Sequence, residues 1–224
     1  EKRINGMKFF LDTANLDQIK EASDLGILDG VTTNPSLMSK EGVRGKQAIM
    51  DHYVKICEIV GGDVSAEVIA TDYEGMLREA DELVALHPNI VVKIPCIKEG
   101  IKAIRSLTNK GIRTNCTLIF SPGQALLAAK AGATYASPFI GRLDDVSTDG
   151  VELVAQIVDM YDLYGYPTQV IAASIRHTMH IIQCMEAGAH VATCPLNAIL
   201  GLLKHPLTDI GLEKFLADYR KLNG

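Results

Sequence analysis

The sequence lacks the features that mark membrane, secreted and nucleic-acid-binding proteins. No apolar segment reaches the length needed to span a bilayer, and the N-terminal residues contain no signal-peptide core. No basic tract stands out among the 22 Lys and Arg residues, which are outnumbered by 27 Asp and Glu residues for a net charge of −5. Because binding to nucleic acid needs clustered basic residues, we expect neither a nucleic acid nor a membrane as a partner.

Patterns for disulfides, metals and nucleotide cofactors are also missing. The five cysteines are scattered without a CxxC pair, which favours reduced thiols in a cytoplasmic protein over disulfides or a zinc site. The six histidines form no HExxH motif, and a pair such as His177 and His180 on one helix face is more often partly buried surface than a metal site. No GxGxxG or Walker loop follows a predicted strand. We therefore expect no metal and no cofactor.

A regular alternation of strands and helices runs through the 224 residues, of which 47% are hydrophobic. Residues 1–6 are interpreted as an added leader or tag, and residues 7–224 as one domain. Short apolar runs predict strands near residues 8–12, 30–35, 64–68, 89–95, 113–119, 134–137, 169–173 and 190–193. A helix follows each strand, with loops after residue 35 and through residues 141–142, and a further helix covers residues 207–222. This α/β pattern predicts a single (β/α)8 TIM barrel with an extra C-terminal helix; an open doubly wound sheet is the alternative.

One lysine stands in the middle of a strand-like run from Asn89 to Pro95. Its neighbours Val92 and Ile94 are β-branched and apolar, so Lys93 is expected to be desolvated, which costs free energy for an ammonium group. Desolvation favours the neutral amine, which a Schiff-base nucleophile requires. The alternative is a strand-end lysine whose charge extends to water.

Polar residues recur at the predicted carboxyl ends of the strands, where a barrel carries its active site. They are Asp12, Thr32, Asn34, Glu67, Lys93, Asn115, Thr117, Ser137, Ser174 and His190. Any Asp, Asn, Ser or Thr at such a junction could instead be a helix cap. Lys93 and Glu67 fall on adjacent strands, and an amine beside two carboxylates favours carbonyl chemistry through an imine.

Two arginines lie in the loops after the sixth and seventh predicted strands. Arg142 and Arg176 occupy the region where barrel enzymes usually bind phosphate, and Ser174 lies at a predicted helix N-terminus that favours an anion. The alternative for each arginine is a surface salt bridge.

Five motifs together resemble the transaldolase family in its short form, a group that includes fructose-6-phosphate aldolase. They are LDT at 11–13, GVTTNPS at 30–36, VVKIP at 91–95, SPFIGR at 137–142 and HPLTD at 205–209. The resemblance runs from Met7 to the C-terminal helix.

The resemblance implies a role for each site residue. Lys93 would form the Schiff base, Asp12 would take the proton of the substrate C4 hydroxyl, and Glu67 would act through a water during imine formation and hydrolysis. The dihydroxyacetone hydroxyls and that water would be held by Asn34, Asn115, Thr117 and Ser137, with Thr117 counted among the catalytic residues. Thr32 and Phe139 would also bind the substrate. The sugar phosphate would be bound by Arg142, Ser174 and Arg176.

Two positions indicate the branch of the family. Fructose-6-phosphate aldolases have Gln where this chain has Glu67 and Tyr where it has Phe139, so we expect a transaldolase of the pentose phosphate pathway. It would convert sedoheptulose 7-phosphate and glyceraldehyde 3-phosphate into erythrose 4-phosphate and fructose 6-phosphate. The alternatives are an aldolase that releases dihydroxyacetone and a non-catalytic barrel that binds sugar phosphates. Cys96 and Ile97 depart from the family, which often has Thr just after Pro95.

The final helix has an apolar stripe at helical spacing, formed by Leu212, Phe215, Leu216 and Tyr219. In relatives this helix packs on a neighbouring subunit, so the resemblance implies a ring-shaped homo-oligomer, a pentamer or decamer. The alternative is that the stripe packs on its own barrel.

Overall fold

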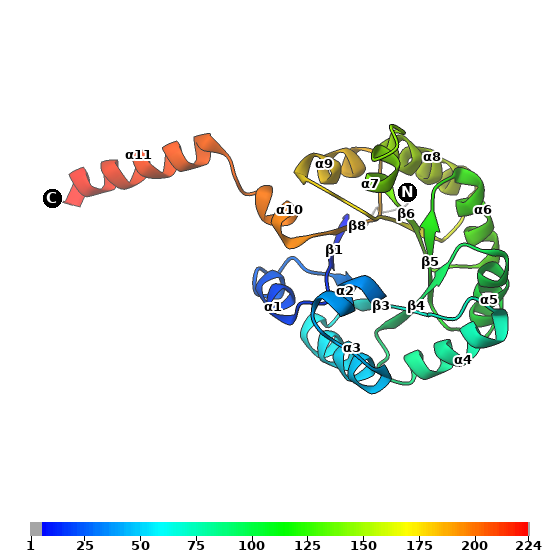
Figure 1. Ribbon diagram of the computed structural model, residues 1–224. Coiled ribbons are helices and arrows are strands. Elements are labelled where there is room, and N and C mark those ends of the chain that lie inside the picture. The colour runs from blue at the N-terminus through cyan, green and yellow to red at the C-terminus, as the bar shows by residue number, and fades with distance from the viewer. Residues whose placement is uncertain (1–5, 224) are drawn as a thin grey trace.

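The computed structural model describes residues 6–223 and contains eight parallel strands closed into a barrel (Figure 1). Each strand pairs with its neighbours in sequence, and β1 pairs with β8 to close the ring. The strands are β1 (Lys8–Asp12), β2 (Gly30–Thr32), β3 (Asp63–Glu67), β4 (Ile90–Pro95), β5 (Thr114–Ile119), β6 (Tyr135–Pro138), β7 (Gln169–Ala172) and β8 (Val191–Cys194). The predicted TIM barrel is confirmed. The prediction of a leader rests mostly on residues 1–5, which lie outside the described residues.

Helices α1 to α10 surround the barrel, and several of them begin at a residue whose side chain caps the first turn. Asn15 accepts a hydrogen bond from the Gln18 amide, and Ser121, followed by Pro122, accepts one from Gln124. The helices are α1 (Leu16–Asp24), α2 (Pro35–Lys40), α3 (Lys46–Val60), α4 (Tyr73–Val84), α5 (Lys98–Asn109), α6 (Pro122–Ala131), α7 (Ile140–Asp144), α8 (Gly150–Tyr164), α9 (Thr178–Glu186), α10 (Leu196–Gly201) and α11 (Pro206–Asn223).

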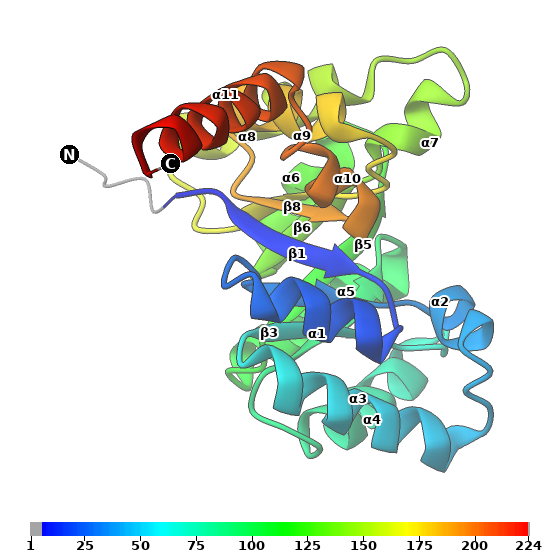
Figure 2. The same ribbon diagram turned by 90° about the vertical axis from the view of Figure 1, so that its left-hand side faces the viewer.

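Two short helices stand where the sequence predicted loops. The expected second strand stops at Thr32, and α2 starts at Pro35 because the Asn34 side chain accepts a hydrogen bond from the Leu37 amide. The segment after β6 contains α7 instead of a continuous loop. Figure 2 shows α2 and α7 at the end of the barrel toward which β1 points. Both helices therefore stand at the carboxyl ends of the strands.

The barrel interior is apolar at one level and polar at the next. A cluster of buried side chains, which we call the floor, consists of Phe10, Val91, Tyr135, Ile171 and Val191. Gly30 permits the position of the Phe10 ring, because a Cβ at Gly30 would lie 2.6 Å from a ring carbon. Side chains alternate across a strand, so residues two positions further along point into the same lumen. Four strands thereby place polar side chains above the floor: Asp12, Lys93, Ser137 and Thr193.

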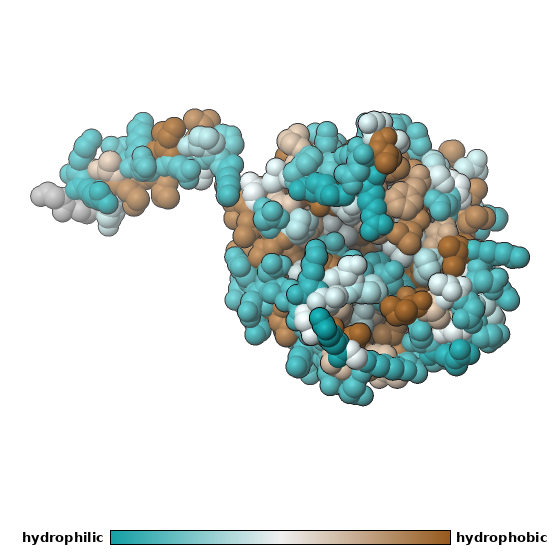
Figure 3. Space-filling view, in the orientation of Figure 1, coloured by the Kyte–Doolittle hydropathy of each residue, from teal (hydrophilic) through white to brown (hydrophobic). Residues whose placement is uncertain are grey.

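The C-terminal helix α11 projects away from the barrel (Figure 1). Its large apolar residues are 47–84% exposed, and Figure 3 shows apolar side chains along the projecting helix. The alternative that this stripe packs on its own barrel is therefore wrong. Among residues 6–223, none of the helices combines the length and the hydrophobicity that crossing a bilayer requires.

Candidate active site

Lys93 is buried inside the barrel and paired, and its charge does not extend to solvent. Its residue exposure is 5%, and the strand register places Glu67 opposite it on β3. The Nζ atom lies 3.2 Å from Glu67 Oε2 and donates a hydrogen bond of 3.0 Å to the Thr33 carbonyl oxygen. The ammonium group therefore has an anionic partner within direct contact distance, a carboxylate that can also receive its proton.

The second carboxylate, Asp12, belongs to a chain of hydroxyl groups at the mouth. Thr32 Oγ1 donates to Asp12 Oδ1 at 2.8 Å and lies 2.5 Å from Thr193 Oγ1. Burial raises the pKa of the Asp12 carboxyl above its ordinary value of 3.8, while the Lys93 charge and the Thr32 hydrogen bond oppose that rise. A carboxyl group with a raised pKa is a stronger base once it is ionised.

Asn115 connects the third strand with the sixth. Its Nδ2 donates to Ser65 Oγ at 3.1 Å, and its Oδ1 accepts from Ser137 Oγ at 2.7 Å. Thr117 is also buried, and its Oγ1 has no hydrogen-bond partner among the described residues. A buried hydroxyl without a partner is costly, so this atom is suited to a ligand or a water molecule.

The cavity at the barrel mouth has a volume of about 90 Å³. Its lining includes eight of the predicted site residues: Asp12, Thr32, Asn34, Lys93, Ser137, Phe139, Arg142 and Ser174. Glu67 and Asn115 do not line it but contact Lys93 and Ser137, which do. Thr117 and Arg176 are likewise absent from its lining.

One predicted site residue lies at the wrong end of the barrel, and one polar lining residue, Thr193, was not predicted. His190 precedes β8, where its backbone and side chain accept hydrogen bonds from Lys8 and Val170. The prediction that it faces the mouth is wrong because β8 runs from Val191 to Cys194. The residue of this strand that faces the mouth is Thr193. Its polar side chain near the carboxyl end of an apolar run was the sequence signal that could have identified it.

The two arginines differ in their contacts. Arg142, on α7, lines the mouth cavity and lies over the Phe139 ring at 4.8 Å from its centroid. Arg176 donates to Asp145 Oδ2 at 2.7 Å in an exposed ion pair, as the salt-bridge alternative predicted. The predicted helix start at Arg176 is also wrong, because α9 begins at Thr178 with His177 as its cap.

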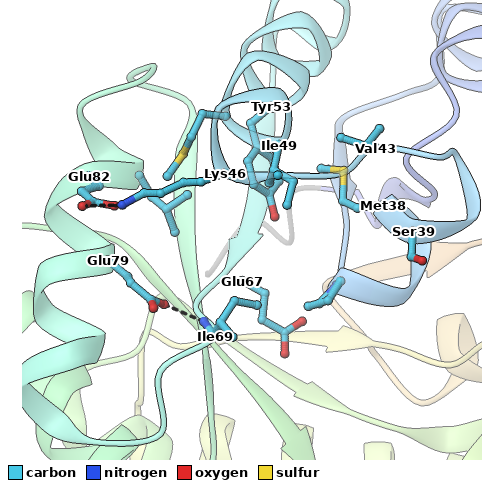
Figure 4. A pocket seen from close by; sticks show the side chains of 14 residues that line it. Met38, Ser39, Val43, Lys46, Ile49, Tyr53, Glu67, Ile69, Glu79 and Glu82 are labelled. Carbon is cyan, nitrogen blue, oxygen red and sulfur yellow. Dashed lines mark hydrogen bonds and ion pairs between the residues drawn. The ribbon is translucent and has the colours of Figure 1, made fainter.

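A second and larger cavity, of about 390 Å³, lies between α2, α3 and α4 (Figure 4). Most of its wall is apolar, with Met38, Ile49 and Tyr53 among the lining residues, and the Glu67 side chain reaches it. Apart from Glu67, its charged lining residues are paired within its wall: Lys46 with Glu82, and Glu79 with the Ile69 amide. Lys93 and Asp12 line the smaller cavity, and Glu67 contacts Lys93 from the side, so chemistry at the amine is expected in the smaller cavity.

A lysine and carboxylates at the carboxyl ends of the strands are the arrangement expected of a (β/α)8-barrel enzyme, whose active site lies at this end. Residues 9–224 match the family described as Transaldolase/Fructose-6-phosphate aldolase. The chain therefore belongs to this family.

Individual relatives agree with the family match. A protein of Parabacteroides distasonis named "Probable transaldolase" is 75% identical over 97% of this chain and all of its own length. A protein of Bacteroides thetaiotaomicron with the same name is 72% identical over the same shares. Thiamine phosphate pyrophosphorylase from Pyrococcus furiosus has a TM-score of 0.60 at 13% identity, with 84% of this chain and 85% of that chain covered. That last likeness concerns the fold alone.

Proposed function

We propose that the protein is a transaldolase that carries a dihydroxyacetone unit on Lys93 as a Schiff base. The observation that carries this proposal is the direct contact between the buried Lys93 ammonium and Glu67, beside Asp12 in the same lumen. The unit passes from sedoheptulose 7-phosphate to glyceraldehyde 3-phosphate, and erythrose 4-phosphate and fructose 6-phosphate are formed.

Imine formation begins when the ammonium group loses a proton to Glu67. The neutral amine of Lys93 then attacks the ketone carbon of the donor, and the carbinolamine loses water as Glu67, acting through a bridging water, returns a proton to the departing oxygen. The protonated imine is an electron sink. When Asp12 takes the proton of the C4 hydroxyl, the bond between C3 and C4 breaks and its electron pair forms a neutral enamine. The acceptor aldehyde reverses these steps.

The polar groups around Lys93 can bind the two ends of the donor sugar, its dihydroxyacetone end and its phosphate end. The dihydroxyacetone hydroxyls and the water released on imine formation are assigned to the amide and hydroxyl groups of Thr32, Asn34, Asn115, Thr117 and Ser137. Arg142 and Ser174, which line the mouth, bind the phosphate of the sugar. Arg176 joins them when the anion replaces its exposed partner Asp145.

Phe139 and Glu67 favour transfer over release. Phe139 lies against Phe120 and Arg142, so no side-chain hydroxyl stands at this position to orient a water that would protonate the enamine. Glu67 supports the transaldolase assignment through the family resemblance, because the aldolases have glutamine at this position.

Reduction with borohydride in the presence of fructose 6-phosphate, followed by peptide mapping, tests the proposal. We expect a dihydroxyacetone-sized adduct on Lys93 that is absent in Lys93→Met and retained in Lys98→Met, which changes a lysine at the start of α5. Adding erythrose 4-phosphate before borohydride should remove the adduct by transfer. Phosphate binding without an adduct would instead favour the non-catalytic barrel, and release of dihydroxyacetone as fast as transfer would favour the aldolase.

We also propose that the protein is a cytoplasmic homo-oligomer, a pentamer or decamer assembled through α11. The exposed apolar residues of this helix support it, since Phe215 is 71% exposed and Leu222 is 84% exposed in the single chain. Light scattering should give five or ten subunits for the whole chain, and fewer after Phe215→Glu.

A further inference from the structure

A buried histidine behind the mouth joins the two loops that carry the arginines. His180, on α9, is 3% exposed, and its Nε2 lies 2.7 Å from Asp144 Oδ2. Its Nδ1 accepts a hydrogen bond of 3.1 Å from the backbone amide of Arg176. Because Nδ1 is an acceptor, the neutral ring carries its proton on Nε2 and donates it to Asp144.

Asp144 extends this connection to the element that carries Arg142. It is the last residue of α7, two positions after Arg142, and its Oδ1 accepts a hydrogen bond of 3.0 Å from the Gly150 amide at the start of α8. At the other end of α7, the Gly141 amide donates to the Ser174 carbonyl oxygen at 3.1 Å. A five-residue helix is too short to be stable alone, so these bonds determine where α7 lies.

The two loops approach each other closely, and both Gly141 and the His177–His180 pair contribute to this contact. A Cβ at Gly141 would overlap the Ser174 carbonyl oxygen and the Arg176 side chain. The ring of His177 lies over the ring of His180 with centroids 3.8 Å apart, and its Nδ1 accepts the His180 amide. His180 is therefore fixed from three sides and has little freedom to release Asp144.

We propose that His180 and Asp144 are positioning residues for the phosphate group of the substrate. Their hydrogen bond holds α7 against the loop after β7, so that Arg142 and Ser174 converge on one anion and Arg176 stands beside them. Neither residue lines the mouth cavity, so each acts through the arginines. The identification of the anion as the substrate phosphate rests on the proposed function. The hydrogen bonds that join the two loops do not depend on it.

Three variants separate positioning from stability. His180→Phe keeps a ring but removes both ring hydrogen bonds, and His180→Gln keeps an N–H group that can donate to Asp144. Tyr161→Phe is the matched control, because it removes one buried hydrogen bond, from Tyr161 near the end of α8 to the Ala125 carbonyl on α6, in which His180, Asp144 and the arginines take no part. Thermal unfolding measures the stability of each variant.

Calorimetry with inorganic phosphate, together with steady-state kinetics on fructose 6-phosphate and on fructose, provides the readout. In His180→Phe we expect the phosphate Kd and the fructose 6-phosphate KM to rise about tenfold, kcat to stay within about twofold, and fructose kinetics to be unchanged. His180→Gln should recover most of the affinity, and Tyr161→Phe should retain all of it.

The remaining outcomes would refute either the positioning role or the proposed function. Unchanged phosphate affinity in His180→Phe, an equal loss with fructose, or a wild-type protein that binds no phosphate would overturn the positioning role. A wild-type protein that binds phosphate, loses that affinity in His180→Phe, yet forms no borohydride adduct would refute the proposed function and leave the positioning role standing.

Discussion

Glu67→Gln should destabilise the protein far more than its conservative chemistry suggests. The substitution removes the anionic partner that lies 3.2 Å from Lys93 Nζ, in a pair whose side chains are 7% and 17% exposed. At an effective dielectric constant of about 20, two unit charges at that distance attract by about 5 kcal/mol. The Thr33 carbonyl still accepts from the ammonium, so we expect a loss of about 3 kcal/mol of unfolding free energy, at the lower end for broken buried pairs.

A matched control is available in the same part of the chain. Lys46 and Glu82 form an ion pair of 2.6 Å, shorter than the first, but their side chains are 71% and 45% exposed. Glu82→Gln should therefore cost at most about 1 kcal/mol. Distance alone predicts the opposite order, so the comparison isolates the effect of burial.

Thermal unfolding at a fixed protein concentration is the assay. For a chain of this size the Glu67→Gln loss corresponds to a fall in Tm of about 6–12 °C. Adding Lys93→Met to Glu67→Gln should recover most of the loss, and the double-mutant cycle should give a coupling energy of about 2–3 kcal/mol. Equal losses in Glu67→Gln and Glu82→Gln, or a coupling energy near zero, would refute this reasoning.

Three further predictions concern the mouth and the backbone around it. Asp12→Asn should lower kcat by a factor of about 10²–10⁴. Because burial raises the folded-state pKa of Asp12, the same change should stabilise the protein at neutral pH. The gain should shrink as the pH falls through that raised pKa and should be absent below 3.8, so a gain that persists in acid in urea unfolding would contradict this reasoning. Gly100→Ala should cost about 1–3 kcal/mol because its Cβ would overlap the Pro95 carbonyl, whereas Gly123→Ala, with its nearest atom at 3.9 Å, should cost nothing in the same unfolding assay. Phe139→Tyr should raise the ratio of dihydroxyacetone release to transfer, measured in one coupled assay with and without erythrose 4-phosphate. An unchanged ratio would show that residue 139 does not determine whether the unit is released or transferred.

The barrel and its central ion pair follow from the sequence because strand period and strand order determine both. Alternation places Lys93 on the inner face of β4, and sequential pairing of parallel strands places Glu67 beside it. The strand boundaries differ from the predicted ones by at most three residues, and the first strand has the predicted bounds. The error at the eighth strand did not come from its boundary: the predicted range 190–193 has His190 at its amino end and Thr193 at its carboxyl end, so Thr193 and not His190 should have been assigned to the mouth.

Short helices and loop partners were harder to predict. α2 and α7 contain six and five residues, too few for a helical period, although Asn34-Pro35 has the same cap-and-proline pattern that identified the start of α6 at Ser121-Pro122. The partner of Arg176 depends on how two loops pack, which no local pattern specifies. Its contact with Asp145 therefore emerges only from the structure.

The floor of the barrel governs how molecules reach Lys93 and leave it. Phe10, Tyr135 and their neighbours in the floor block the lumen, so nothing passes from the mouth to the amino-terminal end of the strands. In the proposed transfer, the aldehyde released from the donor and the aldehyde that accepts the unit would both move through the approach above Asp12 and Arg142. The two molecules would therefore occupy the same space, and the first has to depart before the second can bind. A lumen that opens at one end therefore predicts a ping-pong mechanism. Double-reciprocal plots of rate against donor concentration, at several acceptor concentrations, should give parallel lines.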